Sequence, residues 1–393
     1  MTRILYTAFD LVPSPKGAST HITYVIRGLV AAGYDVQLIT PGDGLLPAEG
    51  MYEGACVTRV PPTGEANFLS RAVAFGQAVE AHLQAAPPYD IVHYRSIWGG
   101  LQLARARSRY HYTTLFEVNG LQSIELKYHY RALQTTPLLS KIREQELATL
   151  ALSDAVVCPS DVTRAFLASM GVPRSRITVV PNGVNTREFA PTPLPPAAGR
   201  VPTILYIGTL ADWQGLEVLL DALPAVLATQ PVRVRIVGRG RSRQHKLLDK
   251  QVRKLGLEAH VSVEEAVPHH EVPALIAAAD VCVAPLALND RNVTQGCCPI
   301  KVLEYMAAGR PLVAANLPVV RELAREDVDA LLFAPGDPDD LARQLVRVLA
   351  DRTLAERLAS AAAERAQAQF TWHRSQKRLL KVYEQFGKVP DTS

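Results

Sequence analysis

Two kinds of segment alternate along the first half of the chain, and this alternation limits the fold more than any other feature. Short runs rich in β-branched and apolar residues, such as 4–7, 36–40 and 91–94, alternate with longer segments such as 20–32. In the longer segments apolar residues recur with the spacing of one helix face. Strands that alternate with such helices are typical of βαβ units and a parallel sheet. The sequence therefore predicts an α/β fold with a doubly wound sheet.

Proline residues gather in the segment 191–199 and interrupt this rhythm. A run of this kind favours an extended, semi-rigid connector between two folded parts. Beyond it the rhythm starts again, with a predicted strand at 203–207 and a predicted helix at 215–228. We therefore expect three parts: a domain over 1–190, a second domain over 200–370, and a C-terminal helix over 371–393.

Length and composition fit two folded domains and exclude several other classes of protein. The chain has 393 residues, and domains hold roughly 100–200 residues each. With 48% hydrophobic and 20% charged residues, it resembles neither a disordered tail protein nor a collagen-like array. Lys and Arg total 42 against 38 Asp and Glu, so the net charge is +4. This small excess suits a local site for a small anion, and we expect no nucleic-acid partner.

The cysteines and the N-terminus indicate a cytoplasmic protein. The five cysteines are odd in number, none lies in a Cys-x-x-Cys pair, and Cys297 and Cys298 are adjacent. Such usage is typical of a reducing compartment. The apolar run at the N-terminus stops at Asp10, so it is shorter than a signal-peptide core with its cleavage site or a membrane span. We interpret this run as a buried first strand.

Peripheral contact with a membrane stays open as an alternative. The segment 126–150 has the length of an amphipathic helix, and basic and aromatic residues are interleaved from Lys127 to Arg131. Glu144 and Glu146 in the same segment argue against a membrane-facing helix. Aromatic residues of this kind more often pack inside the protein.

Five short segments in a fixed order carry the most specific signal. They are Pro181-Asn182-Gly183 with Phe189 shortly after, Gly208-Thr209-Leu210 with Gly215, Ile236-Val237-Gly238, Ala279-Asp280-Val281, and Glu304-Tyr305-Met306-Ala307-Ala308-Gly309-Arg310-Pro311. Alone, Asn182-Gly183 is a turn, because both residues tolerate positive φ. In this order the segments resemble the family 4 glycosyltransferases, which are retaining enzymes of the GT-B fold. The resemblance implies two Rossmann-like domains that face each other across a cleft, with a C-terminal helix crossing back to the first.

The resemblance also implies the reaction and its partners. The second domain would bind a nucleotide diphosphate sugar as co-substrate, and the first would bind a carbohydrate or small-molecule acceptor. In such enzymes the leaving diphosphate takes the proton of the acceptor hydroxyl, so the protein mainly stabilises the leaving group. No Asp-x-Asp motif or His/Cys cluster with ligand spacing is visible, and we expect no metal and no other cofactor.

Local chemistry in the second domain supports a diphosphate site. Gly208 and Gly215 flank a loop between a strand and a helix, where backbone amides can approach a phosphate, although a tight turn explains them equally well. The segment 294–299 precedes a helix with Pro299 expected at its first position. Lys301, in the first turn, adds a positive charge if it is not simply an exposed lysine.

The resemblance assigns further roles in this domain, and the chain also departs from the pattern. Glu304 would hold the ribose hydroxyls, and the stretch at His269 would meet the base unless that histidine only caps a helix. The first of the family's two glutamates falls on Gly296, so Thr294 and Gln295 become the groups available to the donor sugar. The family's phosphate-binding arginine and lysine correspond here to Thr209 and Gln214. We expect some of Arg239, Arg241, Arg291 and Lys301 to replace that charge.

The first domain departs from the pattern as well. Of the family's glycine pair after the first strand, Gly17 remains and Ala18 takes the second place. Ser19 or Thr20 is expected to cap the helix that follows, and His21 is expected to be structural. Where the family often has a histidine near the transferred sugar, this chain has Asn119, whose amide can bind a sugar hydroxyl or the acceptor.

These arguments yield three sets of candidate residues. The candidate catalytic residues are Asn119, Lys301 and Gln295. The candidate donor-binding residues are Gly17, Gly208, Thr209, Gln214, Arg239, Arg241, His269, Arg291, Thr294, Gly296, Cys297, Cys298 and Glu304. The candidate acceptor-binding residues are Lys16, Ala18, Arg95 and Glu117.

Two other functions fit the same residues. A nucleotide-sugar epimerase on this fold would need acids or bases in the cleft, and the loss of a glutamate at Gly296 and of a histidine at Asn119 argues against it. A nucleotide-sugar-binding partner subunit without catalysis would tolerate these departures and those at Thr209 and Gln214. Among these functions, transfer of a sugar is the one that the sequence favours.

Overall fold

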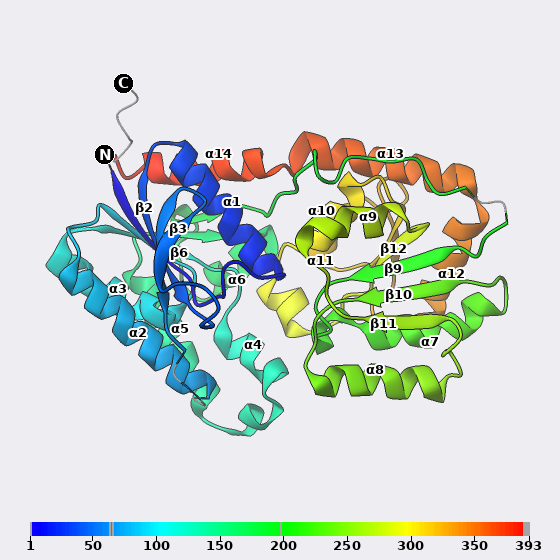
Figure 1. The fold of residues 1–393 in the computed structure, drawn as a ribbon, viewed down its shortest axis with the longest axis horizontal. Helices are drawn as coiled ribbons and strands as arrows, with labels where there is room; N and C mark the ends of the chain where they lie inside the picture. The colour runs from blue at the N-terminus through cyan, green and yellow to red at the C-terminus, as the bar shows by residue number, and fades with distance from the viewer. Residues whose placement is uncertain (1, 63, 65–66, 197–198, 388–393) are drawn as a thin grey trace. The chain divides into compact units, whose positions relative to one another are not determined.

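The computed structural model describes residues 2–62, 64, 67–196 and 199–387. The chain divides into two compact units, residues 1–181 with 373–393 and residues 182–372 (Figure 1). Residues 197 and 198 of the expected connector, and residues 388–393 of the expected C-terminal helix, lie outside the described residues. Each unit contains a largely parallel sheet, which confirms the prediction of two Rossmann-like units.

The first unit is built on an eight-stranded sheet with the strand order β3-β4-β2-β1-β5-β6-β7-β8. In the described residues β3 pairs antiparallel with β4, and the other neighbouring strands pair in parallel. The order reverses between β1 and β5, and ligands of open α/β sheets bind where such a reversal occurs. The strands are β1 (Arg3–Thr7), β2 (Asp35–Pro41), β3 (Glu49–Tyr52), β4 (Ala55–Val60), β5 (Ile91–Tyr94), β6 (Thr113–Glu117), β7 (Ala155–Cys158) and β8 (Ile177–Val179).

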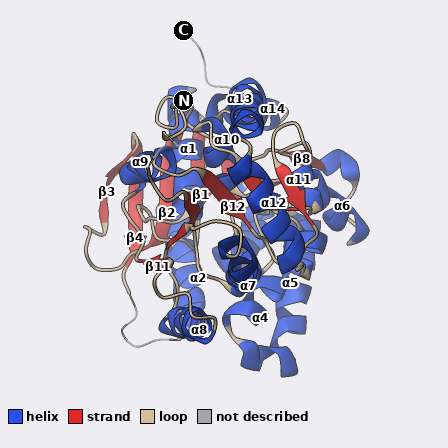
Figure 2. Cartoon of the chain, turned by 90° about the vertical axis from the view of Figure 1, so that its right-hand side faces the viewer, coloured by secondary structure: helices blue, strands red, loops and turns tan. Residues whose placement is uncertain are grey.

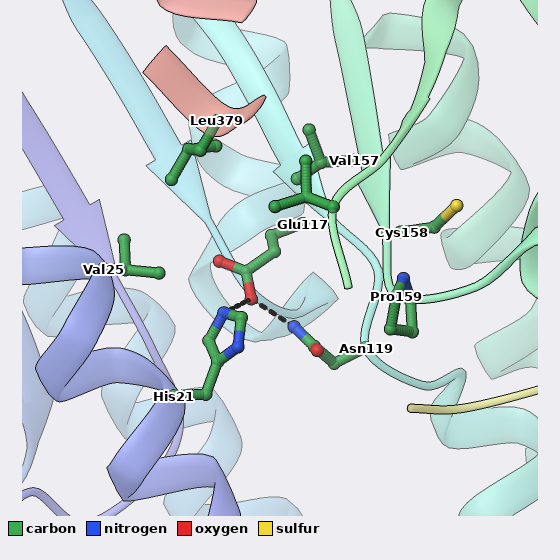
Figure 3. Close-up of a pocket in the computed structure, with 9 residues that line it drawn as sticks. His21, Val25, Glu117, Asn119, Val157, Cys158, Pro159 and Leu379 are labelled. Carbon is green, nitrogen blue, oxygen red and sulfur yellow. Dashed lines mark hydrogen bonds and ion pairs between the residues drawn. The ribbon is translucent and has the colours of Figure 1, made fainter. Parts of the chain in front are cut away.

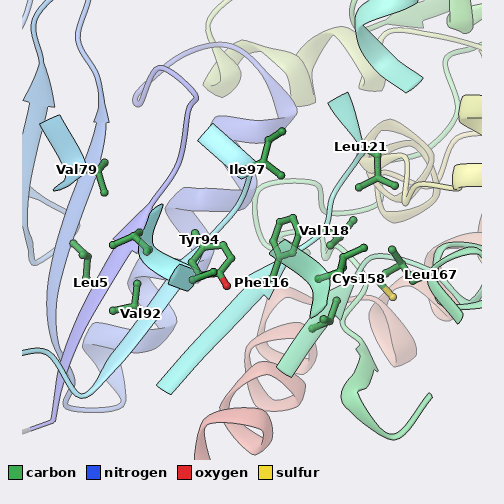
Figure 4. Packing of buried hydrophobic residues seen from close by; sticks show 14 of the residues in the cluster. Leu5, Val79, Val92, Tyr94, Ile97, Phe116, Val118, Leu121, Cys158 and Leu167 are labelled. Carbon is green, nitrogen blue, oxygen red and sulfur yellow. The ribbon is translucent and has the colours of Figure 1, made fainter. Parts of the chain in front are cut away.

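Successive side chains of a strand point to opposite faces of the sheet. Apolar residues of the central strands therefore lie on both faces, and helices cover both. Leu5 of β1 belongs to one buried cluster, which Figure 4 shows from close by, and Ile4 and Tyr6 belong to the other. Both clusters are closed by apolar helix faces. The helices are α1 (Gly17–Ala31), α2 (Phe68–Ala85), α3 (Ile97–Tyr110), α4 (Gln122–His129), α5 (Leu138–Leu152), α6 (Asp161–Ser169) and α14 (Trp372–Glu384), with short 3₁₀ turns at Arg131–Thr135 and Arg174–Arg176.

The last helix, α14, packs on the first unit, as expected for a C-terminal helix that crosses back. Leu379, Val382 and Tyr383 are buried in the same cluster as Ile22 of α1. Nε2 of Gln376 donates a hydrogen bond of 2.7 Å to the backbone oxygen of Tyr24. Helix α14 is therefore part of the hydrophobic core of the first unit although it follows the second unit in sequence.

The second unit has a six-stranded sheet in the order β11-β10-β9-β12-β13-β14, and its described strand pairs are parallel. Figure 2 distinguishes the strands of both units from the helices around them. The strands are β9 (Thr203–Ile207), β10 (Arg233–Val237), β11 (Val261–Glu264), β12 (Val281–Ala284), β13 (Leu312–Ala315) and β14 (Leu331–Phe333). The helices are α7 (Leu216–Leu227), α8 (Ser242–Lys254), α9 (Val272–Ala277), α10 (Ile300–Ala307), α11 (Pro318–Arg321), α12 (Pro338–Ala350) and α13 (Arg352–Gln369), with short turns at Asp212–Gln214, His269–Glu271 and Arg291–Gln295.

The structure differs locally from two possibilities that the sequence left open. The segment 126–150 is not one helix, because α4 ends at His129 and α5 begins only after Pro137. Helix α1 begins at Gly17, so Ser19 lies inside its first turn and accepts a hydrogen bond from the backbone of Ser14. None of the described helices is long and apolar enough to cross a membrane.

Candidate functional site

In the second unit, the candidate donor residues gather where β9 ends and α10 begins. Gly208 follows β9 with φ +149°, and a Cβ atom placed there would lie 2.6 Å from Nζ of Lys301. Gly215 has φ +67°, a left-handed conformation that favours glycine, and its missing side chain makes room for the backbone oxygen of Pro285. The two glycines therefore let the chain turn tightly beside the lysine.

Lys301 is held by two uncharged partners. Its Nζ atom donates hydrogen bonds of 2.8 Å to the hydroxyl of Tyr206 and 2.7 Å to Oε1 of Gln214. Gln214 in turn donates through Nε2 to the hydroxyl of Thr209 at 3.3 Å. Burial lowers the pKa of Lys301 to about 7, and the nearby carboxylate of Glu304 opposes this shift. The site thus contains an amine that an anionic ligand would stabilise in its charged form.

The loop before α10 is shaped by a short π-helical turn, Arg291–Gln295, and by Gly296 with φ +79°. The guanidinium of Arg291 lies 4.8 Å above the ring of Trp213, which places it beside the turn that carries Gln214. Asn182 donates a hydrogen bond of 2.6 Å to the backbone oxygen of Cys298 and so anchors the loop. This anchor connects the Asn182 segment, singled out in the sequence, to the candidate donor loop.

Glu304 lies one helical turn after Lys301 and is 8% exposed. Nε2 of His269 lies 3.4 Å from Oε1 of Glu304, and the ring of His269 packs edge-on against Phe189. The hydrogen bond to Glu304 raises the pKa of His269. The expected ribose and base residues, Glu304 and His269, are therefore neighbours in the structure.

The remaining donor candidates lie in different surroundings. Arg239 and Arg241 are exposed, and the backbone oxygen of Arg239 accepts a hydrogen bond of 3.0 Å from Leu210 in the loop after β9. Thr294 is exposed, whereas Gln295, Gly296, Cys297 and Cys298 are buried. Of the four cations expected to serve the diphosphate, Lys301 and Arg291 are partly buried beside the turn at Asp212–Gln214. The roles of these residues stay predictions.

In the first unit, a buried carboxylate lies at the carboxyl end of the central strands. Oε1 of Glu117, on β6, lies 2.7 Å from Nε2 of His21 and accepts a hydrogen bond of 2.9 Å from Nε of Arg95. Its Oε2 atom accepts one of 2.8 Å from the hydroxyl of Tyr6 and lies 3.1 Å from Nε2 of His93. Asn119 also donates to Oε1 through its Nδ2 atom.

These partners keep Glu117 ionised. Burial by itself raises the pKa of Glu117, but the charges of His21 and Arg95 and the hydrogen bonds of both histidines lower it well below its usual range. Nη1 of Arg95 also donates a hydrogen bond of 2.9 Å to Oδ2 of Asp10, so its guanidinium contacts two carboxylates. The acceptor candidates Arg95 and Glu117 are therefore paired with each other inside the protein.

A small pocket opens beside this carboxylate. Figure 3 shows His21 and Asn119 pointing toward Glu117 from different elements. The other acceptor candidates differ in exposure, because Lys16 and the donor candidate Gly17 are exposed and Ala18 is partly buried. The residues that line the pocket are His21, Val25, Glu117, Asn119, Val157, Cys158, Pro159, Val180 and Leu379.

Sequence reasoning missed several residues of these two groups. His21 was expected to be structural, yet it lies against Glu117 beside Asn119. Tyr206, which holds Lys301, lies in a largely apolar strand, and its position near the strand end was the one available signal. His93 and Tyr383 are bonded to each other at 2.7 Å from distant segments, and no local pattern indicates that contact.

Comparison with known proteins gives the family. A family model described as "Glycosyltransferase Family 4" matches residues 15–188, and one described as "Glycosyl transferases group 1" matches residues 201–351. The chain belongs to glycosyltransferase family 4. The two matches divide this glycosyltransferase in the same way as the two sheets do.

Individual relatives agree with this assignment. The glycosyltransferase is 28% identical over 389 residues to the phosphatidyl-myo-inositol mannosyltransferase of Mycobacterium leprae, and the match covers 96% of this chain and 94% of that protein. Its fold is similar to that of sucrose-phosphate synthase from Thermosynechococcus elongatus, with a TM-score of 0.84 and 21% identity. The match covers 98% of this chain and 99% of that structure. It is also similar to Anabaena HepE in complex with UDP-glucose, with a TM-score of 0.76 and 18% identity. This match covers 98% of this chain and 100% of that structure. The expected GT-B fold is confirmed.

Among the described residues, no group of three or more His, Cys, Asp or Glu is arranged to hold a metal ion. None of the five cysteines forms a disulfide in the part of the chain that the structure describes, and Cys56 is the exposed one. Independence from metal ions stays a prediction for this glycosyltransferase.

Proposed function

We propose that this glycosyltransferase moves a sugar from a nucleoside diphosphate donor to an acceptor hydroxyl, with retention at the anomeric carbon. The bond between the anomeric carbon and the diphosphate oxygen breaks, and a bond to the acceptor oxygen forms. The acceptor proton passes to the leaving diphosphate. The noncatalytic subunit and the epimerase are not favoured, because the similar proteins are named as glycosyltransferases.

The observation that carries the proposal is the position of Lys301. Its amine lies beside the loop after β9, and its hydrogen-bond partners Tyr206 and Gln214 bear no charge. A diphosphate at this loop would supply the negative charge that these partners lack, and the amine would stabilise the leaving group. HepE, a protein of the same fold, was solved with UDP-glucose, which supports this class of donor.

Retention is supported by the state of the carboxylate nearest Asn119. Glu117 already receives hydrogen bonds or close contacts from five side chains, and its pKa is held low. It is therefore a poor base for an acceptor hydroxyl. A mechanism in which the leaving diphosphate takes the proton requires no base from the protein.

Binding of nucleotide sugars tests the donor site directly. We expect UDP-glucose or GDP-mannose to raise the melting temperature of the wild-type protein, because a ligand that binds only the folded state stabilises it. Lys301→Met should weaken this binding about 10- to 100-fold, the usual loss for a charged hydrogen bond. Lys250→Met, on the exposed side of α8, is the matched control.

Two outcomes would contradict the proposal. Equal donor affinity in the Lys301→Met and Lys250→Met variants would remove Lys301 from the site. A product whose anomeric proton shows inverted configuration by NMR would exclude retention. With myo-inositol as a soluble acceptor, chosen because the similar mannosyltransferase is named for a lipid of that polyol, the same spectra report transfer.

A further inference from the structure

Glu117 joins residues from both sides of the point where the strand order of the first sheet reverses. Tyr6 lies near the carboxyl end of β1, and His93 belongs to β5, its neighbour across the reversal. Glu117 ends the next strand, β6. A carboxylate at this place in a parallel sheet lies where substrates usually bind, but its two oxygens are occupied by protein groups. Direct contact with a ligand is therefore not its main role.

The ionised carboxylate determines how Asn119 is oriented. A carboxylate can only accept hydrogen bonds, so the amide of Asn119 must turn its Nδ2 atom toward Glu117. The Oδ1 atom of the same amide then points away from Glu117. Asn119 is partly buried and lines the pocket, where Oδ1 can accept a hydrogen bond from a hydroxyl group.

A second set of contacts leads from Glu117 through His93 to α14. Burial lowers the pKa of His93 even though Glu117 acts in the opposite direction, so this histidine is neutral. Its Nε2 atom, 3.1 Å from Glu117, then carries the proton, and its Nδ1 atom accepts from the hydroxyl of Tyr383 at 2.7 Å. Glu117 is therefore held by residues on β1 and β5, and through His93 it is linked to α14.

We propose that Glu117 is a positioning residue, which fixes the amide of Asn119 so that its carbonyl oxygen accepts a hydrogen bond from a substrate hydroxyl. Only the identity of the substrate rests on the function proposed above. The orientation of the amide follows from contacts within the first unit. A hydroxyl of the transferred sugar and a hydroxyl of the acceptor have the same chemistry here, and the kinetic test separates them.

NMR of protein labelled with ¹⁵N-asparagine tests the orientation without any activity. The side-chain NH₂ resonances of Asn119 are assigned by their loss in Asn119→Ala. In the wild-type protein their chemical shifts should differ from those of a solvent-exposed asparagine, and the protons should be protected from exchange with solvent. Glu117→Gln should abolish both effects, because the glutamine amide is neutral and can turn either way. Glu146→Gln is the matched control, since Glu146 is another buried carboxylate and accepts hydrogen bonds from Ser123 instead. An unprotected Asn119 amide in the wild-type protein would overturn the proposal.

A double-mutant cycle tests whether the positioning matters for turnover. Glu117→Gln and Asn119→Ala should each slow hydrolysis of UDP-glucose or GDP-mannose, or transfer to myo-inositol, about 10- to 100-fold. The double variant should be no slower than Asn119→Ala, because both changes remove one interaction. If the variants hydrolyse the donor more slowly, the hydroxyl that Asn119 binds belongs to the transferred sugar. If only the transfer rate falls, that hydroxyl belongs to the acceptor.

If the double variant loses turnover by the product of the two single-variant losses, the positioning role is overturned and Glu117 is a purely structural residue. If the wild-type protein bound and hydrolysed neither nucleotide sugar, the donor proposal would fail, while the Asn119 resonance would still decide the orientation. The two proposals can therefore fail separately.

Discussion

The amine of Lys301 lies 2.7 Å from Oε1 of Gln214, one of the two positions where the family resemblance led us to expect a charged phosphate-binding residue. The amine at this place is therefore supplied by the first turn of α10, and the turn after β9 supplies an uncharged side chain that contacts it. Thr209, at the other substituted position, accepts a hydrogen bond from Gln214 and completes the uncharged part of the group.

Exchanging the two residues should therefore preserve the donor site. Lys301→Gln alone should weaken UDP-glucose or GDP-mannose binding about 10- to 100-fold. Adding Gln214→Lys returns one charge to the same place, and we expect affinity to recover to within about tenfold of the wild type. Gln214→Lys alone places two amines together and should lower the melting temperature. Calorimetry checks the affinities, and a double variant as weak as Lys301→Gln would contradict the exchange.

Donor affinity should fall as the pH rises above neutrality. Burial lowers the pKa of Lys301 to about 7 in the free protein, with Arg291 acting in the same direction and Glu304 and Cys297 opposing it. A bound diphosphate favours the charged amine, so binding takes up a proton above pH 7 and weakens by at most about tenfold per pH unit. UDP-glucose suits this measurement because its two phosphates stay ionised throughout. Lys301→Met should flatten the profile.

The same shift predicts how Lys301 affects stability without donor. An unfolded lysine has a pKa of about 10.4, so between pH 7 and that value the unfolded state binds more protons than the folded state. The free energy of unfolding should therefore rise with pH across this window, and urea titrations of Lys301→Met should show a smaller rise. An unchanged slope in the variant would contradict the lowered pKa.

Removing the charge of Glu304 should lower the pKa of His269. The hydrogen bond between them raises the pKa of His269, and Glu188 contributes a smaller charge effect. Because the folded pKa is raised, this interaction stabilises the protein at acidic pH and is lost as the pH rises through that pKa. Glu304→Gln should thus destabilise the protein more at pH 5.5 than at pH 8. NMR titration of His269 checks the shift, and Glu188→Gln should change it less.

Loss of the Tyr383 hydroxyl should destabilise the first unit. Tyr383→Phe leaves Nδ1 of the fully buried His93 without the hydrogen bond that Tyr383 supplies. An unsatisfied buried polar atom costs about 1–3 kcal/mol, which denaturant unfolding can measure. Tyr34→Phe is the control, because Tyr34 packs against the ring of Tyr383 and the described residues give its hydroxyl no hydrogen bond. Equal losses in the two variants would show that packing alone matters.

The sequence predicted much of the fold but not all of it. Runs of mainly apolar residues identified β1, β5 and β9, because strands buried on both faces are mainly apolar. The hairpin of β3 and β4 was not predicted, since Glu49–Tyr52 is exposed and lacks that pattern. Exposed edge strands depend on their partner more than on their own composition.

The candidate sites were predicted in the same uneven way. The sequence placed Lys301 and Glu304 on one helix and Asn119 after a strand, because local spacing determines such positions. It did not predict that His21 would lie against Glu117 or that Tyr206 would hold Lys301. Contacts of this kind join residues that no short-range pattern connects.

From the order of residues alone follow the two α/β units, the family, and the strand ends at which Gly208 and Glu117 lie. Only the folded chain decides which charges are neutralised and which are left for a ligand. Glu117 is surrounded by groups from three other segments, β1, α1 and the end of β5, whereas Lys301 meets uncharged partners. The physical reason is that burial and neighbouring charges set the state of an ionisable group, and both depend on segments that meet only when the chain folds.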